Sequence, residues 1–281
     1  MWFVNAIGTL QKSSGSAHRN SCFFENLHFS EQNTVEKIYF YYSEIITKQY
    51  PTKMESNLKY IEDNYIELEN LAILTHFETA EIEKFILEKL IPSYSYLIHS
   101  EIKISSSLND SHSISTVKKY FSKNVVSLLN DLKTTQNNSE EVKQKFRENF
   151  IQRLLNHSTK EFAYQNLFDE NNRVNEERLD MAFEEEWQHY NNGIYGICTL
   201  NASENDIIDK EIIVKKLIKF NQEKENLKLT DSEKEELKNL NAEFNKSTNL
   251  FAPYQRATSS RGKYLDKILQ ENDLSDLVKK Y

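Results

Sequence analysis

Residues 140–168, EEVKQKFRENFIQRLLNHSTKEFAYQNLF, contain the repeat that decides the fold class of this chain. Apolar side chains recur in this segment every four residues, at Val142, Phe146, Phe150 and Leu154. In an α-helix these positions fall at about 0°, 40°, 80° and 120° around the axis, so they form one apolar stripe. The spacing predicts a long helix over 140–168, with Ser139 as its cap.

Similar stripes recur along the chain from Met54 onward. They predict helices over 56–74, 78–91, 93–108, 114–133, 174–192, 206–228 and 231–247, followed by a short C-terminal helix. Thr230 and Glu233 form a capping-box pattern where the helix over 231–247 begins. Only 5 Gly and 3 Pro occur in 281 residues, whereas a sheet protein needs many turns. We therefore predict an all-α fold, a bundle of about seven to nine helices.

The first part of the chain differs from the rest. Segment 11–34 is polar and has no clear period, and Pro51 stands just before the first regular pattern. We expect residues 1–53 to form an N-terminal arm or a loosely attached extension. Residues 54–281 are then a single helical domain, which is long enough to bury a sizeable core.

Charge and composition exclude several classes of protein. The formal net charge is −8 and no basic stripe stands out, so nucleic acid is not an expected partner. No apolar run approaches the roughly 20 residues that cross a bilayer, so no membrane association is expected. The two cysteines, Cys22 and Cys198, lie far apart and outside any metal-ligand spacing. This cysteine usage favours a reducing, cytoplasmic compartment.

Polar side chains interrupt the predicted apolar stripes. Relative to Val142, His157 falls at about 60° and Glu161 at about 100°, inside the stripe of the helix over 140–168. Because they are four residues apart, these two side chains would stack on adjacent turns.

Two further predicted helices carry carboxylates on their core faces. In the helix over 174–192, Glu186 lies near the middle of the apolar face and His189 lies on its flank, as a Glu-x-x-His pair. In the helix over 93–108, Glu101 falls in the centre of the stripe.

Inward carboxylates need partners, because burying an unpaired carboxylate costs several kcal/mol. Three helices that each supply a Glu, two of them with a nearby His, match what a bundle needs to hold two metal ions. Carboxylate oxygen and imidazole nitrogen suit iron or manganese, and Glu-x-x-His is a spacing found in di-iron bundles. Structural ion pairs, or helix phases that differ from the ideal, are the alternative interpretation of the same residues.

The segment 76–108, HFETAEIEKFILEKLIPSYSYLIHSEIKISSSL, resembles in texture the second and third helices of the heme-oxygenase-like helical superfamily. That group includes TenA-like and PqqC-like proteins and non-heme di-iron oxidases. The resemblance covers about two thirds of the chain and implies a heme-oxygenase-like architecture. It implies five metal ligands: Glu101, His157, Glu161, Glu186 and His189. The chain departs from the di-iron members in having no His after His189.

The function predicted first is a metal-dependent, di-iron oxidase or oxygenase. Two ferrous ions would reduce dioxygen, and a small organic substrate would lie in an aromatic-lined cavity where Tyr164 and Tyr190 orient it or relay protons. A homodimer is the assembly that we predict for this chain. A helical interaction protein, such as a secreted effector or a regulatory partner, is the alternative from another class, and a metal-free enzyme of the TenA type is a third.

Overall fold

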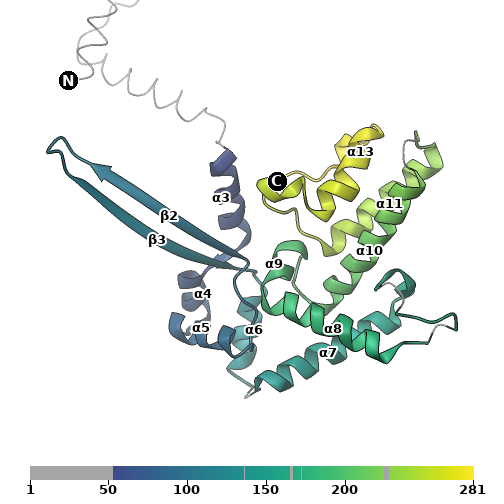
Figure 1. The fold of residues 1–281 in the computed structure, drawn as a ribbon, viewed down its shortest axis with the longest axis horizontal. Helices are drawn as coiled ribbons and strands as arrows, with labels where there is room; N and C mark the ends of the chain where they lie inside the picture. Colours follow the sequence, from purple (N-terminus) through teal and green to yellow (C-terminus); the bar gives the residue numbers. More distant parts are fainter. Residues whose placement is uncertain (1–52, 136, 165–166, 172, 225–227) are drawn as a thin grey trace, which may run out of the picture. The chain divides into compact units, whose positions relative to one another are not determined.

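The computed structural model describes residues 53–281 except 136, 165–166, 172 and 225–227, and residues 52–281 form one compact unit. The predicted extension over 1–53 lies outside the described residues, apart from Lys53. The described part is mostly helical but includes a three-stranded antiparallel sheet with the order β1-β3-β2, of which Figure 1 shows β2 and β3 as a long hairpin. The prediction of a mainly helical fold is therefore confirmed, and the prediction of an all-α fold is wrong.

The first helices are shorter than predicted. They are α3 (Lys53–Asn64), α4 (Leu68–Thr75) and α5 (Thr79–Leu87), with the short strand β1 (Ile66–Glu67) between α3 and α4. The single helix predicted over 56–74 is thus divided at Tyr65, whose ring is buried. The next helix begins with a capping box in which the side chain of Glu78 and that of Glu81 each accept from the other's backbone N–H.

Two predicted helices are a β-hairpin instead. Strands β2 (Tyr96–Ser105) and β3 (Ser111–Phe121) pair antiparallel along their whole length, and β1 pairs only with the last two residues of β3. Asn109 takes a left-handed conformation (φ 62°) in the connecting turn, as Asn tolerates. The helix predicted over 93–108 is therefore wrong, and of the helix over 114–133 only α6 (Val125–Leu132) is helical. We call residues 96–121 the hairpin.

The second half of the chain is helical. Its elements are α7 (Ser139–Asn156), η1 (Lys160–Phe162), α8 (Glu176–Asn191), α9 (Ile194–Cys198), α10 (Glu204–Glu223), α11 (Asp231–Ser247), α12 (Pro253–Arg256), η2 (Gly262–Asp266), α13 (Lys267–Glu271) and η3 (Ser275–Leu277). Helix α11 has the bounds predicted from the sequence, and the capping box of Thr230 and Glu233 is present. Helix α7 ends twelve residues before the predicted bound of 168.

The core consists of several apolar clusters. The largest joins α7, α8 and the start of α10, and its aromatic members include Phe146, Phe150, Phe183, Trp187 and Tyr190. A second lies between α10, α11 and α13, and a third joins α4, α5 and α6 to the end of β3. The apolar stripe predicted on α7 faces the first cluster, which explains why Phe146, Phe150 and Leu154 are all buried.

The base of the hairpin is fastened to the helices. The hydroxyl of Ser95 donates to the carbonyl of Gly193 (3.0 Å), and the hydroxyl of Tyr65 donates to the carbonyl of Gly196 (3.1 Å). A Cβ on Gly196 would lie 2.1 Å from Ser95 Oγ, so only glycine allows this close approach. The hydroxyl of Tyr96 donates to the side-chain carbonyl of Gln255 (2.7 Å). These contacts fasten one end of the hairpin to the helices.

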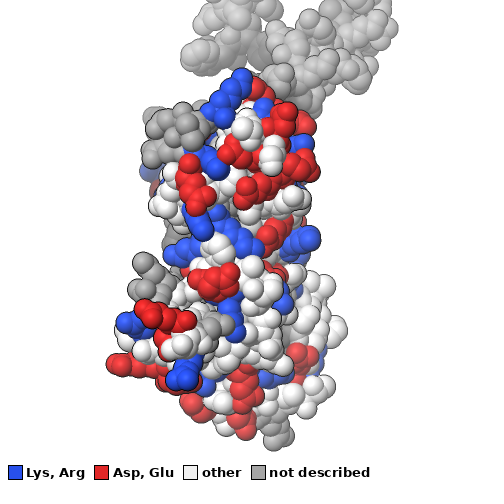
Figure 2. Space-filling model, turned by 90° about the vertical axis from the view of Figure 1, so that its right-hand side faces the viewer, with Lys and Arg blue, Asp and Glu red and all other residues white. Residues whose placement is uncertain are grey.

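Within the described residues, none of the helices has both the length and the apolar character that crossing a bilayer requires. On the face drawn in Figure 2, basic and acidic side chains are interspersed.

Candidate functional site

Glu101, the first predicted metal ligand, lies on β2 and points into solvent. Its side chain is 57% exposed, and Oε1 lies 3.6 Å from Nζ of Lys103 on the same strand. The prediction that Glu101 faces a helical core is wrong because this segment is a strand, in which alternate side chains point to opposite faces.

His157 and Glu161 do not share a helix. Helix α7 ends at Asn156, so His157 is its C-cap, and Glu161 lies exposed in the short helix η1. The backbone N–H of Thr159 donates to Nδ1 of His157 (3.1 Å), and Nε2 lies 3.7 Å from Oδ1 of Asp209. Desolvation by burial lowers the pKa of this imidazole. The predicted stacking of these two side chains on adjacent turns is therefore wrong.

Glu186, His189 and Tyr164 do lie together. Glu186 is buried on α8, and its Oε1 accepts from the hydroxyl of Tyr164 (2.7 Å). Its Oε2 is buried and has no hydrogen-bond partner among the described residues, and the nearest imidazole atom, His189 Nδ1, is 3.9 Å away. Burial raises the pKa of Glu186 to about 7, although the bond from Tyr164 acts in the opposite direction. This carboxyl therefore changes its charge near neutral pH.

The backbone at Tyr164 is strained. Its φ of 46° lies in the left-handed region, which an aromatic residue rarely adopts and which costs about 1–3 kcal/mol. Burial, followed by the charge of Glu186, raises the pKa of its hydroxyl, which therefore stays protonated as the donor. The other predicted catalytic residue, Tyr190, packs in the aromatic cluster, with its ring 4.6 Å from that of Phe146 and stacked at 5.6 Å on Trp187.

The five predicted metal ligands do not converge on one point among the described residues. Among the residues that the structure describes, no group of three or more His, Cys, Asp or Glu side chains is placed to hold a metal ion. Of the five predicted ligands, only Glu186 and His189 are neighbours, whereas bundles of the di-iron type use ligands from four helices. Burial and the raised pKa of Glu186 make this carboxyl a candidate functional group.

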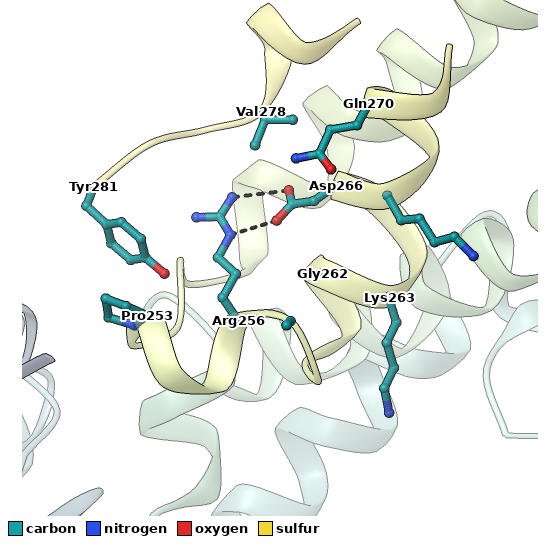
Figure 3. Close-up of a pocket in the computed structure, with 10 residues that line it drawn as sticks. Pro253, Arg256, Gly262, Lys263, Asp266, Gln270, Val278 and Tyr281 are labelled. Atoms are coloured by element: carbon teal, nitrogen blue, oxygen red, sulfur yellow. Dashed lines mark hydrogen bonds and ion pairs between the residues drawn. The ribbon is translucent and has the colours of Figure 1, made fainter. Parts of the chain in front are cut away.

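Two surface pockets lie away from these residues. One, of about 660 Å³, contains Arg256, whose guanidinium makes a two-bond ion pair with Asp266 (Figure 3). This guanidinium also donates to the carbonyl of Lys279, so its hydrogen bonds are made within the chain. The other pocket, of about 890 Å³, is lined in part by lysines, and one of them, Lys224, forms an ion pair with Glu233. Neither pocket is lined by a predicted site residue.

The hairpin is the most exposed element of the described chain. Residues 99–118 are all exposed, and Figure 1 shows this part extending past the neighbouring helices. An isolated two-stranded hairpin is at best marginally stable in water. Here the strand pairing extends to Tyr96 and Tyr120, whose rings are buried, and these rings stabilise only the base of the hairpin.

One face of the hairpin carries four isoleucines, and it also carries the polar side chains of Ser100, His112, Thr116 and Lys118. Residues opposite one another in the register share a face, and the pairs Ile102–Ile114 and Ile104–His112 lie on the same face as Ile98. Ile102, Ile104 and Ile114 are 55%, 50% and 42% exposed. We call Ile98, Ile102, Ile104 and Ile114 the apolar face. Sequence reasoning missed it because it assigned a helical period, although β-branched residues at alternate positions on both sides of Asn109-Asp110 indicate a hairpin.

Residues 142–273 match the model of a family of unknown function, DUF6058. The match runs from α7 through α13 and includes Tyr164, Glu186 and His189, whereas the hairpin precedes it. No curated protein and no solved structure matches the chain.

Proposed function

We propose that this chain is an interaction protein, in which a helical body presents the hairpin to a protein partner. The observation that carries the proposal is the exposure of Ile102, Ile104 and Ile114 on one face of a hairpin that is fastened at its base. Large apolar side chains that are contiguous and exposed are typical of protein–protein contact sites.

The physical reason is the free energy of the exposed isoleucines. Burying apolar surface gains roughly 25 cal/mol per Å², and a fully buried Ile side chain gains about 1.5–3 kcal/mol. Three half-exposed isoleucines on one flat face therefore offer several kcal/mol to a partner that covers them. The strand backbone adds hydrogen-bonding groups at its edge, as in partners that bind by strand addition.

The metal-dependent oxidase stays a prediction from the sequence. The oxidase prediction is favoured by the proximity of Glu186, His189 and Tyr164. It is not favoured by the positions of Glu101, His157 and Glu161, which lie apart from them. Metal analysis of protein reconstituted anaerobically with Fe²⁺ tests it: the prediction requires bound iron that is lost in Glu186→Ala.

A photo-crosslinking amino acid at Ile104 tests the interaction function in the cells that make the chain. The matched control carries the same group at Met181, which is 68% exposed on α8. We expect a discrete cross-linked species from position 104 alone, and its mass should differ from that of two copies of the chain. The proposal is overturned if position 104 gives no more product than position 181.

A pair of substitutions on β3 tests whether the apolar face makes the contact. Ile114→Lys places a charge on that face, whereas Ser115→Lys places the same charge on the opposite face of the same strand, where it faces Glu101. The cross-link from position 104 should disappear with Ile114→Lys and persist with Ser115→Lys. Equal effects of the two substitutions would contradict the assignment of this face.

A further inference from the structure

We infer that two copies of this chain join through strand β2, which pairs antiparallel with its counterpart so that Ile102 faces Ile102 of the second copy. In the part of the chain that the structure describes, the sheet order β1-β3-β2 makes β2 an edge strand, and no strand pairs with one row of its backbone N–H and C=O groups. Strand β2 contains no Pro, and its residues 99–105 are all exposed. Edge strands of this kind pair readily with another strand.

The charges on β2 favour a second copy of the same strand as the occupant. Glu101 and Lys103 flank Ile102, are largely exposed, and form an ion pair with each other along the strand (3.6 Å), which self-pairing would exchange for pairs between the copies. In an antiparallel pair centred on Ile102, Glu101 of each copy lies directly opposite Lys103 of the other, so two ion pairs form across the two-fold axis. Opposite charges at facing positions stabilise antiparallel strands, and like charges destabilise them.

The same charges disfavour neighbouring registers. A pair centred on Glu101 would place two carboxylates opposite each other, and a pair centred on Lys103 would oppose two ammonium groups. A two-fold axis perpendicular to the sheet requires facing residues to lie on the same face of the sheet. The pairs centred on Glu101 and on Lys103 are therefore the registers nearest to the pair centred on Ile102. The sequence Glu-Ile-Lys therefore selects one register of self-pairing.

Self-pairing would also enlarge the apolar face. In the resulting order β3-β2-β2-β3, Ile98, Ile102, Ile104 and Ile114 of both copies lie on one side of a four-stranded sheet. Three or more strands with an apolar face form a more stable unit than a lone hairpin. This inference extends the proposed function, because the dimer would present a continuous platform to the partner, but the two can fail separately.

Sedimentation of the purified full-length chain across the micromolar range tests the inference. We expect a monomer–dimer equilibrium for the wild type. Glu101→Lys and Lys103→Glu should each weaken dimerisation roughly tenfold or more, because two attractive pairs become repulsive. Glu69→Lys, an equal charge change at an exposed position of α4, is the control and should leave the equilibrium unchanged.

Complementation separates pairing from misfolding. An equimolar mixture of the Glu101→Lys chain and the Lys103→Glu chain should form heterodimers, since every facing pair is then of opposite charge. The double variant Glu101→Lys/Lys103→Glu should dimerise like the wild type. A wild type that stays monomeric, or single variants that dimerise unchanged, would overturn the inference. A monomeric chain that still cross-links to another protein from Ile104 would retain the proposed function and lose only the self-pairing.

Discussion

Replacing Glu186 by Gln gives a direct measure of the buried carboxyl on α8. Its pKa in the folded protein is about 7, against an ordinary value of 4.5. Between these two values the folded protein holds a proton that the unfolded chain has released. Unfolding then releases that proton, so rising pH favours unfolding, and the stability present below about pH 4.5 is lost as pH rises to about 7.

The size of the effect follows from the two pKa values. A tenfold change in a proton equilibrium corresponds to about 1.4 kcal/mol, so the whole effect is about 3 kcal/mol. Glutamine keeps the acceptor for the hydroxyl of Tyr164 and does not titrate. The free energy of unfolding of the wild type should therefore fall relative to Glu186→Gln by about 2–3 kcal/mol between about pH 5 and pH 8.

Urea unfolding followed by circular dichroism at several pH values measures this difference. Comparing the two proteins at each pH cancels the titration of the other groups. Glu177→Gln, at an exposed position in the first turn of α8, is the control and should run parallel to the wild type. Parallel curves for Glu186→Gln and the wild type would refute the reasoning, because Glu186 would then titrate alike in both states.

Three further substitutions test the framework by unfolding free energy. Arg261 is fully buried and donates to neutral acceptors on Asn245, Thr248 and Asn249. Arg261→Met should therefore lower the free energy of unfolding by about 3 kcal/mol or more, because these acceptors are left unpaired. A loss below about 0.5 kcal/mol would contradict this. Gly196→Ala should cost about 1–3 kcal/mol by its clash with Ser95 Oγ, and Ser95→Ala should recover part of that loss. Thr230→Ala should lower the free energy of unfolding by about 1 kcal/mol, because it removes the N-cap of α11. An unchanged urea midpoint would contradict the stabilising role of this cap.

The sequence predicts the second half of the fold better than the first. The capping box of Thr230 fixes the start of α11, and the stripe from Phe146 to Leu154 correctly gives the buried face of α7. Local signals of this kind need no tertiary information. The apolar stripe does not by itself show where a helix ends, so the predicted end of α7 is too late. The polar run from Asn156 to Thr159 is typical of a helix end.

The hairpin shows the limit of assigning a period to an isolated segment. Leu97, Glu101 and Leu108 fit a helical spacing, but Ile98, Ile102 and Ile104 fit alternation equally well. The pairing with β3 decides between them, and that pairing is a contact between segments. Glu101 lies away from the other predicted ligands for the same reason, whereas His157 and Glu161 were misplaced because α7 ends at Asn156. Glu186 and His189 were adjacent as predicted because both lie on a helix identified correctly.

The contacts of Ser95, Tyr65 and Tyr96 at the base of the hairpin have a thermodynamic consequence for any partner. A disordered recognition segment must lose conformational entropy when it binds, and this loss subtracts from its affinity. A ladder that is already formed, and is fixed at one end to the helical body, has lost most of that entropy during folding. The hairpin should therefore lose less conformational entropy on docking than a disordered segment of the same length.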